Sequence, residues 1–156
     1  MLTIRGLMAG AILALSLSVH GEVRPFAPAS DTDLHAGYCI GTEEQQAAWE
    51  GNAVAANTPP SDFHRRMAAN AQTRLQRLHH YLDHRLTFVW KTDIDAASKQ
   101  GLADARFIVN DPKVHACTDK CRHLPVNVGV AVKQCIASCD ERLTHIWTCK
   151  DLSWLP

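Results

Sequence analysis

The stretch CTDKCRHLPVNVGVAVKQCIASC (residues 117–139) contains two Cys-x-x-x-Cys pairs, Cys117 with Cys121 and Cys135 with Cys139. Residues four apart lie on one face of an α-helix, one turn from each other. Two such helices joined by a short turn run antiparallel, so the first cysteine faces the fourth and the second faces the third. The stretch therefore predicts a helical hairpin held by two nested disulfides, Cys117–Cys139 and Cys121–Cys135.

The two other cysteines, Cys39 and Cys149, then pair by elimination. An even number of cysteines in an exported chain is typical of a disulfide framework. In the chain-entropy model, the long Cys39–Cys149 loop would stabilise the fold by about 4–5 kcal/mol and each hairpin bridge by about 3 kcal/mol. The alternative is a zinc site made of the four hairpin thiolates. Zinc ligands are usually spaced more closely, and thiols in an oxidising compartment form disulfides first.

The N-terminus has the pattern of a secretory signal peptide over residues 1–21. One basic residue precedes an apolar run, Leu7 to Leu17, and Val19-His20-Gly21 suits a signal peptidase. The alternatives are a membrane anchor or a buried first helix, but the run is shorter than the roughly 20 residues that span a bilayer. No later stretch is apolar enough to cross a membrane, so we expect a periplasmic or secreted protein without a transmembrane segment after signal cleavage.

Residues 22–30 contain two prolines and predict an extended lead, followed by a single helical domain over residues 31–156. No useful stretch alternates apolar and polar residues as a strand would. The predicted fold is all-α, a small disulfide-stapled bundle of about five helices that ends in the cysteine hairpin. Asp31 or Asp33 is expected to cap the first helix, and Asp111 the fourth. The expected helices are 31–52, 61–91, 92–110, one from 111 to a break at 124–125, and 127–149.

The second predicted helix, 61–91, has the clearest apolar stripe in the chain. Its apolar residues recur every three or four positions, which is the period of one helix face. A stripe of this kind is usually core rather than a cofactor pocket. The expected core residues are Phe63, Met67, Ala71, Leu75, Leu78, Leu82, Leu86 and Val89.

Two glycines, Gly37 and Gly41, flank Cys39 at a spacing of four in the first predicted helix. Each costs about 1 kcal/mol of helix stability relative to alanine. Because glycines at this spacing thin one side of a helix, we expect another backbone to approach there.

The second helix also carries three histidines, His79, His80 and His84. His80 and His84 are four apart, a spacing at which two imidazoles can bind copper or zinc on one helix face. The sequence places no third ligand, and the ordinary alternative is a solvent-exposed face.

The same helix has a local charge of +4, from six basic and two acidic residues. One interpretation is a docking face for an acidic partner or lipid, and the other is neutralisation by Glu43, Glu44 and Glu50. Trp49 is expected to anchor the core, whereas Trp154, near the end of the chain, is a candidate partner contact. The candidate partner face consists of Arg66, Arg74, Arg77, Arg85 and Trp154.

The net charge and the absence of known motifs limit the classes of function that the sequence allows. With 16 basic and 16 acidic residues in all and Arg5 lost with the signal, the mature chain has a net charge of −1. This excludes a general nucleic-acid binder, which would be basic. The sequence shows no catalytic motif and indicates no cofactor. We therefore predict a binding protein without catalysis, such as an inhibitor, immunity factor or chaperone-like holdase, with an unknown protein partner. The alternatives are a periplasmic copper- or zinc-binding protein that uses the three histidines, and an enzyme of another class.

Two short segments resemble known families. The cysteine hairpin, residues 117–139, resembles the paired Cys-x-x-x-Cys units of the small chaperones of the mitochondrial intermembrane space, which are shorter and lack a signal peptide. This likeness implies a non-catalytic role and transfers no site residues. Tyr38-Cys39-Ile40-Gly41 is similar to the early Cys-x-Gly of periplasmic immunity proteins that neutralise interbacterial amidase toxins. The chain departs from those proteins in its six cysteines and its polar residues 42–46.

Overall fold

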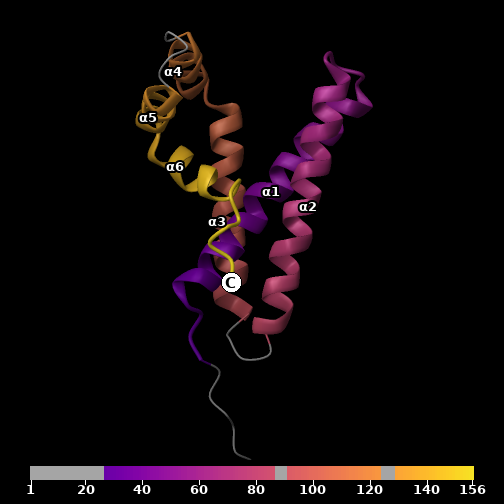
Figure 1. The fold of residues 1–156 in the computed structure, drawn as a ribbon, viewed down its shortest axis with the longest axis vertical. Coiled ribbons are helices and arrows are strands. Elements are labelled where there is room, and N and C mark those ends of the chain that lie inside the picture. Colours follow the sequence, from indigo (N-terminus) through magenta and orange to yellow (C-terminus); the bar gives the residue numbers. More distant parts are fainter. Residues whose placement is uncertain (1–26, 87–90, 124–128) are drawn as a thin grey trace, which may run out of the picture.

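The computed structural model describes residues 27–86, 91–123 and 129–156. These residues form an all-α bundle of six helices (Figure 1). The helices are α1 (Asp31–Ala55), α2 (Ser61–Arg85), α3 (Lys91–Asn110), α4 (Pro112–Arg122), α5 (Gly129–Cys139) and α6 (Glu141–Thr148). The predicted signal peptide and most of the extended lead lie outside the described residues. None of the described helices combines the length and the apolar character that crossing a bilayer requires.

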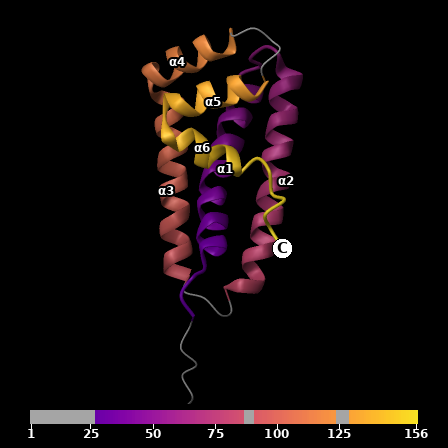
Figure 2. The same cartoon turned by 60° about the vertical axis from the view of Figure 1, so that its left-hand side comes forward.

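Helix α1 is the centre of the bundle and lies between α2 and α3 (Figure 2). Its contact with α3 depends on glycine, as the spacing predicts. A Cβ atom on Gly41 would lie within 3.0 Å of backbone atoms of Ser98 and Leu102, and one on Gly37 would lie 2.8 Å from the carbonyl oxygen of Ile94. The two backbones therefore approach each other more closely than any side chain would permit.

The start of α1 differs from the prediction. Ser30, rather than Asp31 or Asp33, is the N-cap, and its hydroxyl accepts a hydrogen bond from the Asp33 backbone N–H. The Asp33 carboxylate in turn accepts from the Ser30 backbone N–H at 2.9 Å, which completes a capping box. At the start of α4, Asp111 is the N-cap and Pro112 opens the helix, as predicted.

The middle of the apolar stripe of α2 lies in the core, as predicted, but the first residue of the stripe does not. Ala71, Leu75, Leu78 and Leu82 are buried, and all but Ala71 belong to one cluster with residues of α1 and the disulfide Cys39–Cys149. Phe63, however, is 44% exposed. The neighbouring residue His64 turns inward instead, because its ring hydrogen-bonds the buried carboxylate of Glu50. Helix α2 ends at Arg85 with Leu86 as its C-cap, and Lys91, the predicted last residue of this helix, is instead the first residue of α3. Val89 lies outside the described residues.

The cysteine hairpin is formed by α4 and α5. Its disulfides are Cys117–Cys139 and Cys121–Cys135, with Cα–Cα distances of 5.8 and 5.7 Å, and Cys39 joins Cys149 at 5.1 Å. These are the pairs that the spacing predicts. The expected helix 127–149 is instead two helices, so the described bundle has six helices rather than about five. The break is at Asp140, whose carboxylate caps α6 by accepting from the Arg142 backbone N–H.

Candidate functional site

Three carboxylates of α1 are buried and hydrogen-bonded to basic side chains of α2. Helix α1 contributes Asp33, Glu43 and Glu50, which are 0%, 0% and 1% exposed. Their partners in α2 are Arg85, Arg74 and His64, in the reverse order expected of antiparallel helices. Of the three acids expected to neutralise α2, Glu43 does so by pairing with Arg74, Glu50 bonds His64, and Glu44 is exposed.

These pairs change the interpretation of the candidate partner face. Arg74 and Arg85 form salt bridges with the buried carboxylates of Glu43 and Asp33. The Arg77 guanidinium donates to the backbone oxygen of Leu152 at 3.4 Å, and Arg66 is exposed. The arginines are therefore not one free basic surface, because two of them neutralise carboxylates inside the fold.

Asp33 accepts more hydrogen bonds than Glu43 or Glu50. It accepts hydrogen bonds from Arg85 at 2.9 and 3.1 Å and from the Tyr81 hydroxyl at 2.8 Å. The Arg85 guanidinium holds the pKa of Asp33 far below its usual range. Asp33 is therefore ionised throughout the neutral range and joins the start of α1 to the end of α2.

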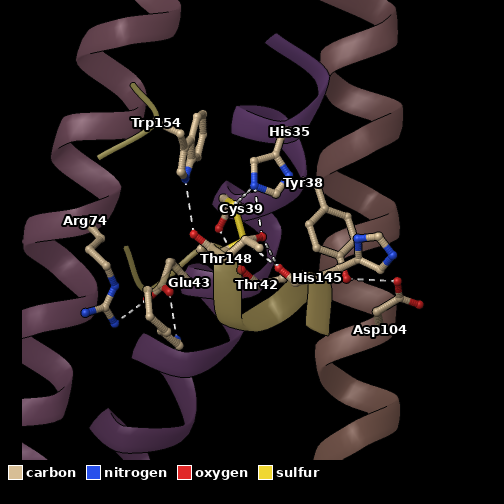
Figure 3. Close-up of a disulfide and its surroundings, with 12 residues drawn as sticks. His35, Tyr38, Cys39, Thr42, Glu43, Arg74, Asp104, His145, Thr148 and Trp154 are labelled. Carbon is tan, nitrogen blue, oxygen red and sulfur yellow. Dashed lines mark hydrogen bonds and ion pairs between the residues drawn. A yellow bond between two sulfur atoms is a disulfide. The ribbon is translucent and has the colours of Figure 1, made fainter. Parts of the chain in front are cut away.

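Glu43 is shared by two cations. Its carboxylate accepts from Arg74 and from Lys150, each at 2.7 Å (Figure 3). Lys150 also donates to the side-chain oxygen of Gln46 at 3.1 Å. Burial lowers the pKa of Lys150, although the neighbouring Glu43 acts in the opposite direction. This cluster joins α1, α2 and the segment that follows α6.

The disulfide Cys39–Cys149 lies beside a half-buried group of aromatic and polar side chains (Figure 3). The His35 Nε2 atom lies 3.0 Å from the Thr148 hydroxyl oxygen and 3.7 Å from the Cys39 sulfur. Burial lowers the pKa of His35. The Trp154 indole N–H donates to the Thr148 carbonyl at 3.2 Å, and its ring packs against His35. Trp154 is therefore half-buried and helps to hold the chain end on the bundle.

The three histidines of the metal hypothesis are exposed on α2. The His80 and His84 rings are neighbours, with centroids 5.0 Å apart. In the part of the chain that the structure describes, the groups of three metal-ligating side chains with atoms within 4.8 Å all include disulfide cysteines. His79, His80 and His84 are not among them, so the metal site remains a prediction from the spacing.

A cleft of about 240 Å³ lies between α1, α3, α4 and α6. Its lining is mainly apolar and includes Trp49, Ala105, Ile108, Val109 and Ile146. Trp49 is 45% exposed, which corrects its expected place in the core. Next to Trp49 lies His64, whose ring packs edge-on against both Trp49 and the exposed Phe63.

The polar groups of the cleft are largely bonded within the protein. The Thr42 hydroxyl donates to the Cys39 carbonyl, and the Gln46 amide donates to Glu50. Gln45 accepts from Arg106 at 3.1 Å. A group that enters the cleft therefore meets mostly apolar surface, and Lys150 is the cation in its wall.

Sequence reasoning missed this cleft. The residues Thr42, Gln45, Gln46 and Trp49 recur at helical spacing, so they could have been assigned to one face of α1. Because three of them are polar, the pattern looks like a solvated face. The opposite wall comes from α3 and α6, which only the tertiary fold brings there.

No protein-family model, curated protein or solved structure matches the chain. The three disulfides are compatible with an oxidising environment outside the cytoplasm.

Proposed function

We propose that this chain is an exported binding protein that holds an apolar side chain of a protein partner in the cleft between α1, α3, α4 and α6. The observation that carries the proposal is an open, mainly apolar cleft with the exposed indole of Trp49 in its wall. Tryptophan is among the residues most often found at the energetic centre of protein interfaces. A catalytic role is not part of the proposal, since the sequence shows no catalytic motif.

The size of the cleft favours an anchor side chain over a whole small molecule. Its volume is about 240 Å³. Sites for drug-sized ligands usually measure about 300–1,000 Å³. A pocket below that range is suited to one large side chain, which is how a buried anchor residue fills its partner's surface.

The walls of the cleft are held rigidly. Lys150 lines the cleft and directly follows Cys149, which is bonded to Cys39 of α1. Helix α1 is itself fixed against α3 by the contact at Gly41. A pocket that is formed before the partner arrives loses less conformational entropy on binding. Disulfides and the signal-type N-terminus support a periplasmic or secreted location.

Nuclear magnetic resonance titration with capped amino acids tests the proposal. We expect N-acetyl-L-phenylalaninamide to shift the Trp49 indole resonance and the backbone amide resonances of Ile108 and Val109 saturably, and N-acetylglycinamide to leave them unchanged. The amide resonances report binding where the indole is absent. Trp49→Ala should abolish binding. Phe63→Ala is the matched control, because Phe63 is equally exposed at 44% but does not line the cleft. Binding that survives Trp49→Ala, or an absence of saturable shifts, would overturn the proposal.

A further inference from the structure

Two cations beside the cleft, Arg74 and Lys150, share the carboxylate of Glu43. Glu43 supplies one negative charge, whereas Arg74 and Lys150 supply two positive charges. The Glu43 side chain is 0% exposed, and those of Arg74 and Lys150 are 16% and 31% exposed. In the described part of the chain, the buried Nε atom of Arg74 has no hydrogen-bond acceptor. A second carboxylate, that of Glu50, also acts on Lys150, to which Gln46 links it by hydrogen bonds. The cluster therefore offers a ligand hydrogen-bond donors rather than a net charge.

Lys150 presents a hydrogen-bond donor to the cleft. Its ammonium group has three N–H donors. Two of them are used by Glu43 and Gln46, and within the described residues no acceptor is seen for the third. Because Lys150 and Gln46 both line the cleft, an anion placed there would meet a donor that is already held in position.

We infer that the cleft recognises an apolar group bearing a carboxylate, in the form of the C-terminal apolar residue of a partner chain. This inference rests on the proposed function and specifies its ligand. Ile108, Val109 and Ile146 would receive the side chain, and the Lys150 ammonium would bind the terminal carboxylate. Burial lowers the pKa of Lys150, so an added carboxylate would also offset the cost of keeping that amine charged.

A C-terminal residue fits better than an internal acidic segment for a geometric reason. A cleft of about 240 Å³ must hold the apolar side chain close to the Lys150 wall. A C-terminal residue has its side chain and its carboxylate on the same Cα atom. In an internal segment the carboxylate belongs to the next side chain and lies farther from the apolar group.

Two ligands that differ only in charge test the inference. N-acetyl-L-phenylalanine has a carboxylate where N-acetyl-L-phenylalaninamide has a carboxamide. We expect the acid to bind the wild-type protein about tenfold more tightly or better, since a hydrogen bond to a charged group exceeds a neutral one by roughly this factor. Equal binding of both ligands would overturn the inference and leave the proposed function standing. Binding of neither would overturn the proposed function.

Substitution of the lysine assigns the effect to a residue. In Lys150→Met, the acid should lose its advantage while the amide still binds. Lys99→Met, in the first half of α3 and exposed, is the matched control and should leave the advantage intact. The wild-type comparison does not depend on whether Lys150→Met folds. An advantage that persists in folded Lys150→Met would overturn the role of Lys150.

Peptides identify the source of the carboxylate. Acetyl-Gly-Ser-Phe with a free C-terminus should bind more tightly than acetyl-Gly-Phe-Glu-amide, whose carboxylate lies on the following residue. Equal or tighter binding of the second peptide would overturn the C-terminal assignment in favour of an internal acidic segment.

Discussion

The close contact between α1 and α3 makes Gly41 a position at which a single added methyl group tests the packing of the bundle. In Gly41→Ala, the new Cβ would lie 2.6 Å from the backbone nitrogen of Leu102 and closer still to the carbonyl oxygen of Ser98. Real Cβ atoms essentially never approach other atoms within 3.0 Å. Since both obstacles are backbone atoms, no side-chain rotation relieves the clash, and α3 must move away from α1.

The magnitude follows from two opposing effects. Overpacking a close contact costs about 1–3 kcal/mol, and occasionally more when backbone must shift. Alanine in place of glycine regains up to about 1 kcal/mol of helix propensity. We therefore expect Gly41→Ala to lower the free energy of unfolding by about 2 kcal/mol or more.

Gly51→Ala is the matched control, because Gly51 lies in the same helix and a Cβ added there would meet nothing within 4 Å. It should stabilise the protein by about 0.5–1 kcal/mol. Equilibrium urea unfolding with the disulfides intact, followed by circular dichroism, measures both variants. If Gly41→Ala proves as stable as Gly51→Ala, the backbone contact between α1 and α3 is wrong.

Three further predictions concern charge, disulfides and metal. The folded state lowers the pKa of Asp33, so its contribution is present above the unfolded pKa near 4 and is lost as pH falls below that value. The stability advantage of wild type over Asp33→Asn in urea should accordingly shrink below about pH 4, and a constant difference would contradict this. Replacing Cys39 and Cys149 with alanine should cost about 4–5 kcal/mol, against about 3 kcal/mol for the inner bridge of the α4–α5 hairpin, in urea unfolding; equal losses would contradict the chain-entropy account. If α2 binds metal, copper and zinc titration should show binding that His80→Ala/His84→Ala loses, and equal, weak binding by both proteins would eliminate the site.

The cysteine pairing within the hairpin was predictable because it depends on helix periodicity and on a short connection between the two helices. Once Cys117 and Cys121 share a face, and Cys135 and Cys139 share another, antiparallel packing permits one nested arrangement. The approach of a second backbone at Gly41 was predictable for the same reason, since glycine spacing is a local property. That α3 supplies this backbone is a tertiary fact, and no local pattern identifies it.

Other features were not predicted because the local sequence pattern pointed to one structure and a tertiary contact or a capping bond produced another. The apolar stripe predicted Phe63 in the core, but the buried carboxylate of Glu50 draws His64 inward instead. Residues 127–149 are periodic enough for one helix, yet the Asp140 carboxylate caps a new one. The cleft was not predicted because its α1 wall consists mostly of polar residues. Its opposite wall comes from α3 and α6, which are far from α1 in the sequence.

The buried carboxylates explain how a helix with few large apolar residues can position a cleft. Helix α1 meets α3 through glycine and α2 through Asp33, Glu43 and Glu50. If α1 slid or rotated by one residue, these acids would lose their partners, and an unpaired buried charge costs about 3–5 kcal/mol. The pairs need not add much net stability in order to exclude such alternatives. Because two faces of α1 are fixed in this way, the third face, with Trp49, is held against α3 and α6 at the cleft.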